Sequence, residues 1–109
     1  MEVVDVAKLM KRLIDALRDE GHRSEGLVQA KAEAICCYDK AMGIATTTLK
    51  ATGSPATLIG SLAKAECAEV LRAKIVAEET LKAHYSRIEI LKAQLNGYQS
   101  INRYLADTA

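Results

Sequence analysis

The chain has 109 residues, of which 50% are hydrophobic and 27% charged, with one proline and no tryptophan or phenylalanine. This length fits a single helical domain over 1–109, and we expect no second folded domain. The formal net charge is +1, and because acidic and basic residues are mixed along the whole chain, no segment has the basic excess of a nucleic-acid-binding tail.

The N-terminal segment has an apolar stripe at helical spacing, which predicts an amphipathic helix over 3–20. Its apolar positions are Val6, Leu9, Met10, Leu13, Ile14 and Leu17. Gly21 then stands where a C-cap glycine would, and Ser24 is typical of a new helix N-terminus. We therefore expect the first arm of the molecule to be broken near Gly21.

A continuous helix through Gly21 is the alternative interpretation. The step of eleven residues from Leu17 to Val28 keeps an apolar stripe in phase along one helix. Gly21 and Gly26 would each cost such a helix about 1 kcal/mol.

The next segment, 26–51, is predicted to be a second helix because apolar residues recur there every seven positions. These residues are Val28, Ile35, Met42 and Leu49, with Tyr38 and Ala45 between them. The last turns contain Gly43 and three consecutive threonines, which are poor helix formers. Tertiary contacts must therefore hold this end of the helix.

The sharpest turn signal of the chain is Gly53, Ser54 and Pro55. Glycine favours a helix stop, whereas serine caps a helix start and proline suits the first helical position. This order predicts that one helix ends at Gly53 and that a third runs over 55–106, with a possible irregularity at Gly60 and Ser61.

The third predicted helix carries an apolar heptad seam, that is, residues spaced alternately three and four apart. We take six of its residues as the interaction seam: Leu81, His84, Ile88, Leu91, Leu95 and Tyr98. The two arms on either side of the turn have matching stripes. They predict an all-α fold, a long antiparallel helical hairpin of coiled-coil type in which Met42 lies near Cys67 and Leu17 near Leu91.

Several apolar residues fall outside the seams and predict a second apolar strip on the flanks. They are Leu27, Ile44, Val76, Ile90 and Ile101. Two hairpins could bury this strip as a helical bundle, so we expect a homo-oligomer, a dimer or a tetramer. The alternative is a compact three-helix monomer.

No residue pattern indicates catalysis, a cofactor or a metal site. Cys36 and Cys37 are neighbours and do not form the paired spacing of a zinc site, and Cys67 makes the count odd. His84 interrupts the apolar seam, where a polar residue most often fixes helix register. The cysteine usage predicts a cytoplasmic protein, and no apolar stretch predicts a membrane span.

The segment Leu49–Ile59, with its Gly-Ser-Pro-Ala-Thr turn, resembles small helical proteins of bacterial phages and prophages. The run from Ala77 to Tyr85 and the later Gln99-Ser100-Ile101 with Arg103 are similar to the second half of those proteins. The resemblance covers about the last sixty residues. It implies a phage-encoded protein in a bacterial cytoplasm, near replication or recombination functions, and supplies no catalytic residues.

These observations favour a non-catalytic scaffold or adaptor that packs against itself or against a partner helix. The alternative is an accessory nucleic-acid-binding protein of a phage replication or recombination module, in which several copies align their cations into one surface. The candidate cations are Lys8, Lys11, Arg12 and Arg18, or Arg87, Lys92 and Arg103.

Overall fold

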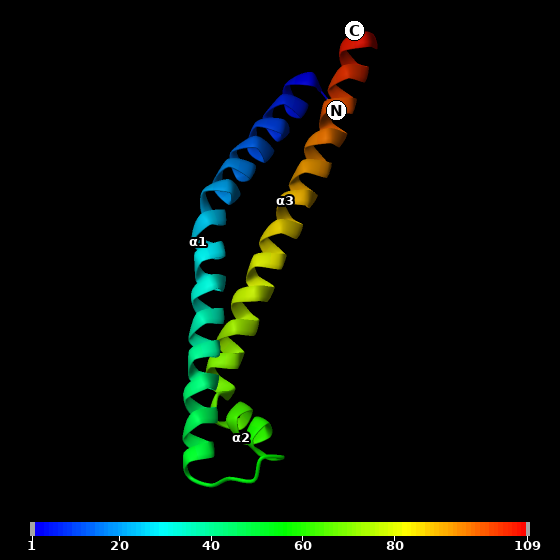
Figure 1. Cartoon of the computed structure of the whole chain (residues 1–109). Helices are drawn as coiled ribbons and strands as arrows, with labels where there is room; N and C mark the ends of the chain where they lie inside the picture. The colour runs from blue at the N-terminus through cyan, green and yellow to red at the C-terminus, as the bar shows by residue number, and fades with distance from the viewer. Residues whose placement is uncertain (1, 109) are drawn as a thin grey trace. The chain divides into compact units, whose positions relative to one another are not determined.

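The computed structural model describes residues 2–108. These residues form three helices: α1 (Val3–Ala51), α2 (Ile59–Glu66) and α3 (Ala68–Thr108). There is no strand in this part of the chain, and α1 packs against α3, so the predicted all-α helical hairpin is confirmed (Figure 1).

Helix α1 runs without interruption from Val3 to Ala51, so the predicted break near Gly21 is wrong and the continuous alternative holds. Ser24 does not cap a helix; its Oγ lies 3.3 Å from the carbonyl oxygen of Glu20 one turn earlier. Glu20 and Ser24 also contact α3. These contacts keep α1 helical at Gly21 and Gly26, although glycine has a low helix propensity that favours a break.

The seam of α1 differs from the predicted one at a single position after the expected break. Glu20 and Leu27 are buried and half-buried, whereas Val28 is 44% exposed. The prediction was wrong at Val28, whereas the other predicted seam residues are buried or half-buried: Ile35, Tyr38, Met42, Ala45 and Leu49. In an unbroken helix the position seven residues after Glu20 is Leu27, which therefore faces inward.

Helix α1 ends in a Schellman motif at the predicted glycine. Gly53 has a φ of 82°, a value that an L side chain rarely adopts. The Gly53 N–H donates to the Lys50 carbonyl at 3.2 Å and the Ser54 N–H donates to the Leu49 carbonyl at 3.1 Å. Both bonds satisfy carbonyl groups of the last helical turn that would otherwise lack a partner.

The next helix starts later than predicted, because Ser54 and Pro55 precede it rather than cap it. A turn follows in which the Leu58 N–H donates to the Pro55 carbonyl at 2.9 Å. Leu58 is the N-cap of α2 and makes no side-chain capping bond. The predicted helix over 55–106 is therefore replaced by a turn, α2 and α3.

The irregularity expected at Gly60 and Ser61 occurs instead at Cys67, which separates α2 from α3. Its backbone has φ −97° and ψ 17°, outside the α region proper. Cys67 is 6% exposed. Burial of this small side chain beside α1 fixes the bend, whereas Gly60 has open space around it and stays helical.

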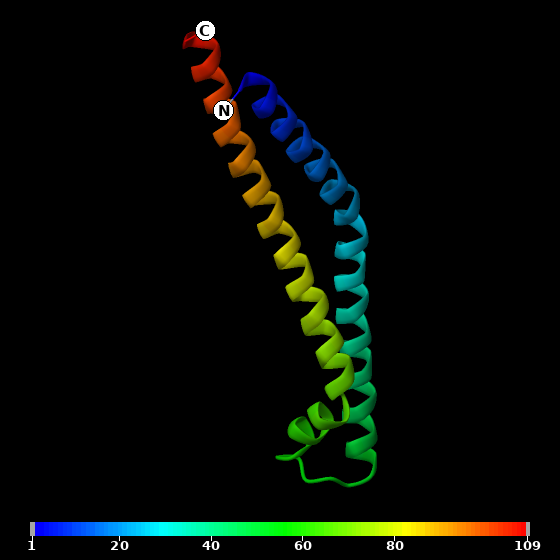
Figure 2. The same cartoon turned by 180° about the vertical axis from the view of Figure 1, so that it is seen from behind.

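The described residues fall into two compact units, each containing part of α1 and part of α3. Unit 2, Gly26–Leu81, also contains α2, which lies between the end of α1 and the start of α3 in both ribbon views (Figures 1 and 2). Its core is Ala45, Ala63 and Cys67, with partly buried residues packed around them. The surrounding residues are Tyr38, Ala41, Met42, Leu49 and Val70. Such small core residues let helix axes approach closely.

Lys74, a half-buried charged residue of α3, has two partners inside unit 2. Its Nζ lies 4.8 Å from the centroid of the Tyr38 ring and 3.9 Å from Glu78 Oε1. The long aliphatic stem of a lysine packs on apolar surface while the ammonium group reaches a carboxylate.

Unit 1 comprises the described residues of Met1–Glu25 and Lys82–Ala109. Here the N-terminal part of α1 and the C-terminal part of α3 run side by side in both views (Figures 1 and 2). Val6 and Leu91 are buried in this unit. Two charged or polar residues, Glu20 and His84, are buried with them, and they form the centre of the candidate site.

Candidate functional site

The six residues predicted as the interaction seam lie on the less exposed face of α3. Leu81, His84 and Leu91 are buried, and the others are half-buried. The half-buried residues are Ile88, Leu95 and Tyr98. They belong to the face of α3 that packs against α1, so the seam is occupied within the chain.

A hydrogen bond between buried polar side chains joins α1 to α3 in unit 1. His84 Nδ1 donates to Glu20 Oε2 at 2.9 Å, across 64 positions of sequence. The side chains of His84 and Glu20 are only 2% and 8% exposed. A buried carboxylate is costly unless it is paired, so this contact requires the partners that surround it.

Two arginines complete the coordination of the Glu20 carboxylate. Arg87 Nε donates to Oε1 at 2.7 Å, and an Nη atom of Arg23 lies 3.4 Å from both oxygens. Both arginine side chains are 60% exposed, so their remaining N–H groups reach water. The carboxylate is thus satisfied from one side by the buried imidazole and from the other by solvated guanidinium groups.

Ser24 completes the network on the opposite edge of the imidazole ring. Its Oγ lies 2.7 Å from His84 Nε2 and 3.3 Å from the Glu20 carbonyl oxygen. When His84 is neutral with its proton on Nδ1, Nε2 accepts a hydrogen bond from the Ser24 hydroxyl. Protonated His84 donates to Oγ instead, and the hydroxyl turns to the carbonyl. Both protonation states therefore keep a complete set of hydrogen bonds.

The pKa of Glu20 lies below its ordinary value. Burial of the side chain acts to raise the pKa, whereas the hydrogen bonds from Arg87 and His84 act to lower it. The positive charges of Arg23 and Arg87 act in the same direction. Glu20 is consequently ionised at neutral pH.

Ser24, His84 and Glu20 are linked in the order of a hydrolase triad, but the surroundings of Ser24 do not favour that chemistry. Ser24 lies inside the continuous helix α1, where the nearby backbone N–H groups are used by helical hydrogen bonds. An acyl-transfer site needs free N–H donors beside its nucleophile to stabilise the oxyanion. The network is better suited to fixing the register of α1 against α3.

Sequence reasoning found His84 but missed Glu20 and Ser24 as its partners. A signal was present: with His84 at a seam position, a polar residue at the facing seam position of the first arm is expected. Glu20 and Ser24 occupy consecutive seam positions of α1. They were overlooked because this segment was interpreted as a helix end.

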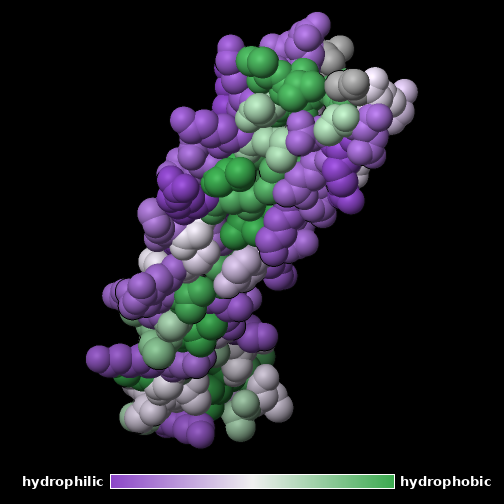
Figure 3. All heavy atoms as spheres, turned by 90° about the horizontal axis from the view of Figure 1, so that it is seen from above, coloured by the Kyte–Doolittle hydropathy of each residue, from purple (hydrophilic) through white to green (hydrophobic). Residues whose placement is uncertain are grey.

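Outside the seam, large apolar side chains remain exposed on both units. In unit 1, Ile90 is 58%, Tyr104 67% and Ile101 40% exposed, and in unit 2, Ile44 is 59% and Val76 56% exposed. Figure 3, seen from above the view of Figure 1, shows that hydrophobic residues reach the surface among hydrophilic ones. Leu27, also expected on this strip, is half-buried.

A hollow of about 290 Å³ interrupts the outer surface of α3 in unit 1. It is lined by Gln94, Gly97, Tyr98 and Ile101. These four residues have the spacing i, i+3, i+4 and i+7, which is that of the hole that receives a side chain of a facing helix in a coiled coil. Gly97 provides the floor, since a glycine has no side chain to fill it.

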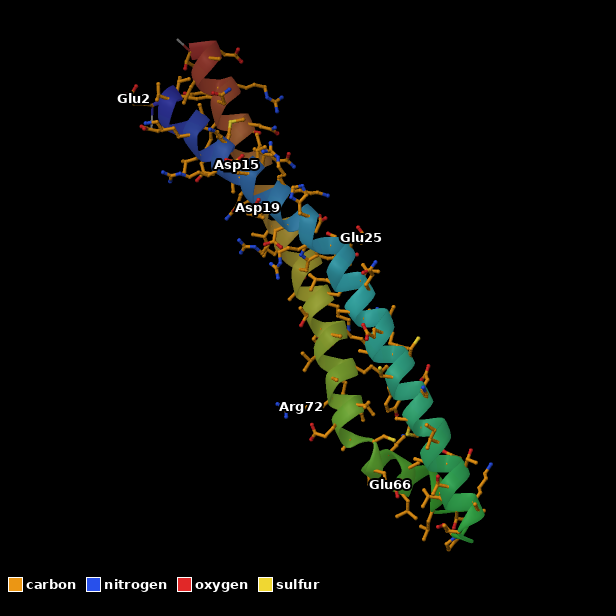
Figure 4. All side chains as sticks on the ribbon, turned by 90° about the vertical axis from the view of Figure 1, so that its left-hand side faces the viewer. Glu2, Asp15, Asp19, Glu25, Glu66 and Arg72 are labelled. Carbon is orange, nitrogen blue, oxygen red and sulfur yellow. The ribbon has the colours of Figure 1, made fainter. Side chains whose placement is uncertain are left out.

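The exposed cations of unit 1 are interspersed with acidic residues. Arg18 lies 3.8 Å from Asp15 and Lys92 lies 3.5 Å from Glu89. Asp15 and Asp19 follow the same stretch of α1 as Lys11, Arg12 and Arg18, as Figure 4 shows for the labelled acids. No continuous basic face results along these residues.

The described residues contain no group of three or more His, Cys, Asp or Glu side chains placed to hold a metal ion. None of the three described helices has an apolar stretch that could cross a bilayer. Cys36 and Cys37 are exposed on α1. Comparison of the chain with protein-family models, curated proteins and solved structures gave no match.

Proposed function

We propose that this protein is a non-catalytic helical scaffold or adaptor that acts by packing its outer apolar surface against a second copy or against a partner helix. The observation that carries the proposal is the exposure of large apolar side chains outside the seam, Ile90 and Tyr104 in unit 1 and Ile44 and Val76 in unit 2. Large apolar side chains exposed in this number on each unit are the kind of surface that a protein partner covers.

The polar chemistry of the chain supports the same proposal. Among the described residues every buried side-chain nitrogen and oxygen has a hydrogen-bond partner, and both oxygens of Glu20 accept bonds from the protein itself. A network used in this way stabilises one pairing of helices and leaves no group free for substrate chemistry.

The nucleic-acid alternative has less support. Of its candidate cations, Arg18 and Lys92 lie beside carboxylates, and Arg87 is bound to Glu20. Pairing with carboxylates lowers the net positive charge offered to phosphate groups.

The resemblance of the Gly53–Thr57 turn to phage and prophage proteins supports a phage-encoded setting for the scaffold.

The proposal is tested by measuring solution mass by light scattering over a hundredfold dilution. We expect the wild type to associate, and a variant with serine at Ile44, Val76, Ile90 and Tyr104 to lose association while keeping its unfolding temperature. In parallel, a photo-crosslinker replacing Val76 reports a heterologous partner in bacterial extract. A wild type that stays monomeric and captures no partner overturns the proposal.

A further inference from the structure

We infer that Cys36 and Cys37 on α1 form a modification site that takes a low-molecular-weight thiol of the glutathione class as a mixed disulfide. Both side chains are exposed in unit 2. Unpaired cysteines are among the most often buried residues of proteins, and the third cysteine of the chain, Cys67, follows that rule at 6% exposure. Packing in the core therefore does not account for the two adjacent thiols of α1.

Helical geometry prevents the two thiols from forming a disulfide with each other. Consecutive Cα atoms are about 3.8 Å apart, whereas the Cα atoms joined by a disulfide are usually at least about 4.4 Å apart. Neighbouring side chains of a helix also point roughly 100° away from each other. Helix α1 is uninterrupted from Val3 to Ala51, so a Cys36–Cys37 disulfide would require the helix to unwind around it.

Cys67 is out of reach of both exposed thiols. It packs in the core of unit 2 with Ala45 and Ala63. Ala45 lies eight residues beyond Cys37, which is about 12 Å along the helix axis. The Cβ atoms joined by a disulfide are only about 4 Å apart. No thiol of the same folded chain therefore displaces a group attached to Cys36 or Cys37.

These constraints determine where thiol–disulfide exchange stops. The Cys37 thiolate attacks one sulfur of oxidised glutathione, a new Sγ–S bond forms and the glutathione disulfide breaks. The released glutathione thiolate takes up the proton that the cysteine lost. In a Cys-x-x-Cys redox pair the second thiolate then displaces the attached thiol. Here the helix blocks that second step, so the mixed disulfide persists until an external thiol reverses it.

The charges beside the pair match a thiol that carries both carboxylates and an ammonium group, as glutathione does. Glu33 and Lys40 lie three or four residues before and after the two cysteines, and residues so spaced are neighbours on a helix surface. Both are exposed, and neither forms an ion pair with another residue in 2–108. Lys40 is therefore available to a carboxylate of the glutathionyl group and Glu33 to its ammonium group.

The modification also bears on the outer apolar surface, and this consequence rests on the proposed scaffold function. Cys37 and Ile44 are seven residues apart and so lie along one line of α1. Ile44 is 59% exposed. Because charged groups are costly to bury against an apolar partner, a glutathionyl group on Cys37 should oppose the packing of Ile44.

Mass spectrometry of the intact folded chain after incubation with oxidised glutathione tests the site. We expect adducts that map to Cys36 and Cys37, no adduct on Cys67, and no internal disulfide. The variant Cys36→Ser with Cys37→Ser should take up no glutathione. The matched control, Cys37→Ser with Asp39→Cys, sets two thiols three residues apart with their Cα atoms about 5 Å from each other. This control should form an internal disulfide and release glutathione.

The charge match is tested with two lysine variants. Lys40→Glu should lower the equilibrium constant for the adduct by about threefold, because an attractive pair becomes repulsive. Lys50→Glu, at another exposed lysine of α1, should leave it unchanged. Equal constants for the two variants would overturn the inference. A Cys36–Cys37 disulfide, a disulfide to a second copy as the main product, or an unmodified chain would do so as well.

Adduct formation does not require association, so it separates this inference from the scaffold function. If the reduced chain stays monomeric and captures no partner, the scaffold function fails while an adduct on Cys36 and Cys37 still supports the modification site. If the reduced chain associates, light scattering should show less association after modification. Association that a complete adduct leaves unchanged would contradict the effect assigned to Cys37 on the packing of Ile44.

Discussion

His84 Nδ1 donates a hydrogen bond to Glu20 Oε2 at 2.9 Å, and this bond between residues 64 positions apart in sequence joins α3 to α1. Both side chains are buried, and Ser24 and Arg87 occupy the remaining positions around them. Because only one relative position of α1 and α3 satisfies all four groups, the contact specifies register as well as pairing. This network is the basis of the first two predictions.

The stability of the protein should fall in acid through Glu20. Its pKa is lower in the folded chain than the ordinary value of 4.5, so the unfolded state binds the proton more readily. The contribution is therefore present above pH 4.5 and is lost as the pH falls through the lower folded pKa. We expect Glu20→Gln to lower the unfolding temperature at pH 7.

The measurement is thermal unfolding of wild type and Glu20→Gln at pH 7, 5, 4 and 3. The gap between the two should shrink as the pH drops, because protonated Glu20 resembles glutamine in charge. Asp19→Asn, at the exposed neighbouring position, is the matched control and should change little. A gap that stays constant with pH would contradict the role assigned to the Glu20 charge.

The unfolding temperature should respond differently when the whole polar network is replaced by apolar residues than when a single member is removed. His84→Leu alone removes a donor from a buried carboxylate and should lower the unfolding temperature by several degrees. Glu20→Leu, Ser24→Ala and His84→Leu together should restore or raise it, because an apolar layer carries no desolvation penalty. The combined variant should lose its single register, seen as doubled or broadened amide resonances. One sharp set of resonances would show that packing alone fixes the register.

The assignment of the seam is tested by substituting two isoleucines of α3 that are two residues apart. Ile88 is half-buried toward α1, whereas Ile90 is 58% exposed. Ile88→Asp should bury an unpaired charge and abolish or severely weaken cooperative unfolding. Ile90→Asp, measured at a concentration where the chain is monomeric, should change the unfolding free energy by less than about 0.5 kcal/mol. Equal effects of the two variants in urea unfolding would contradict the assigned faces.

Glycine-to-alanine substitutions at three positions should change the stability of the protein with opposite signs in the helix and in the turn. Gly21 and Gly26 lie inside α1 with open space where a side chain would be added. Alanine there should stabilise the protein by about 1 kcal/mol each, since helical propensity improves without a clash. Gly53→Ala should destabilise it by about 1 kcal/mol because the φ of 82° is strained for alanine. Denaturant midpoints check the sign at each position, and stabilisation by Gly53→Ala would contradict the Schellman assignment.

The periodicity of the sequence was enough to predict the all-α hairpin. Apolar residues three and four apart identify the face of each helix, and Gly53 marks the end of α1 because it adopts a backbone conformation that favours glycine. The positions of Cys67, Leu81 and Leu91 on the buried face follow from the same spacing. These features are local consequences of residue type and period, so they need no knowledge of the partner helix.

Other features depended on contacts between distant residues. Gly21 and Ser24 have local propensities that favour a helix break, but bonds from Glu20 and Ser24 to His84 keep α1 continuous. Cys67, not Gly60, carries the bend because its side chain is buried beside Ala45. Propensity differences of about 1 kcal/mol per residue are comparable to one tertiary hydrogen bond. Packing between distant residues therefore decided that α1 continues past Gly21 and that the bend between α2 and α3 lies at Cys67.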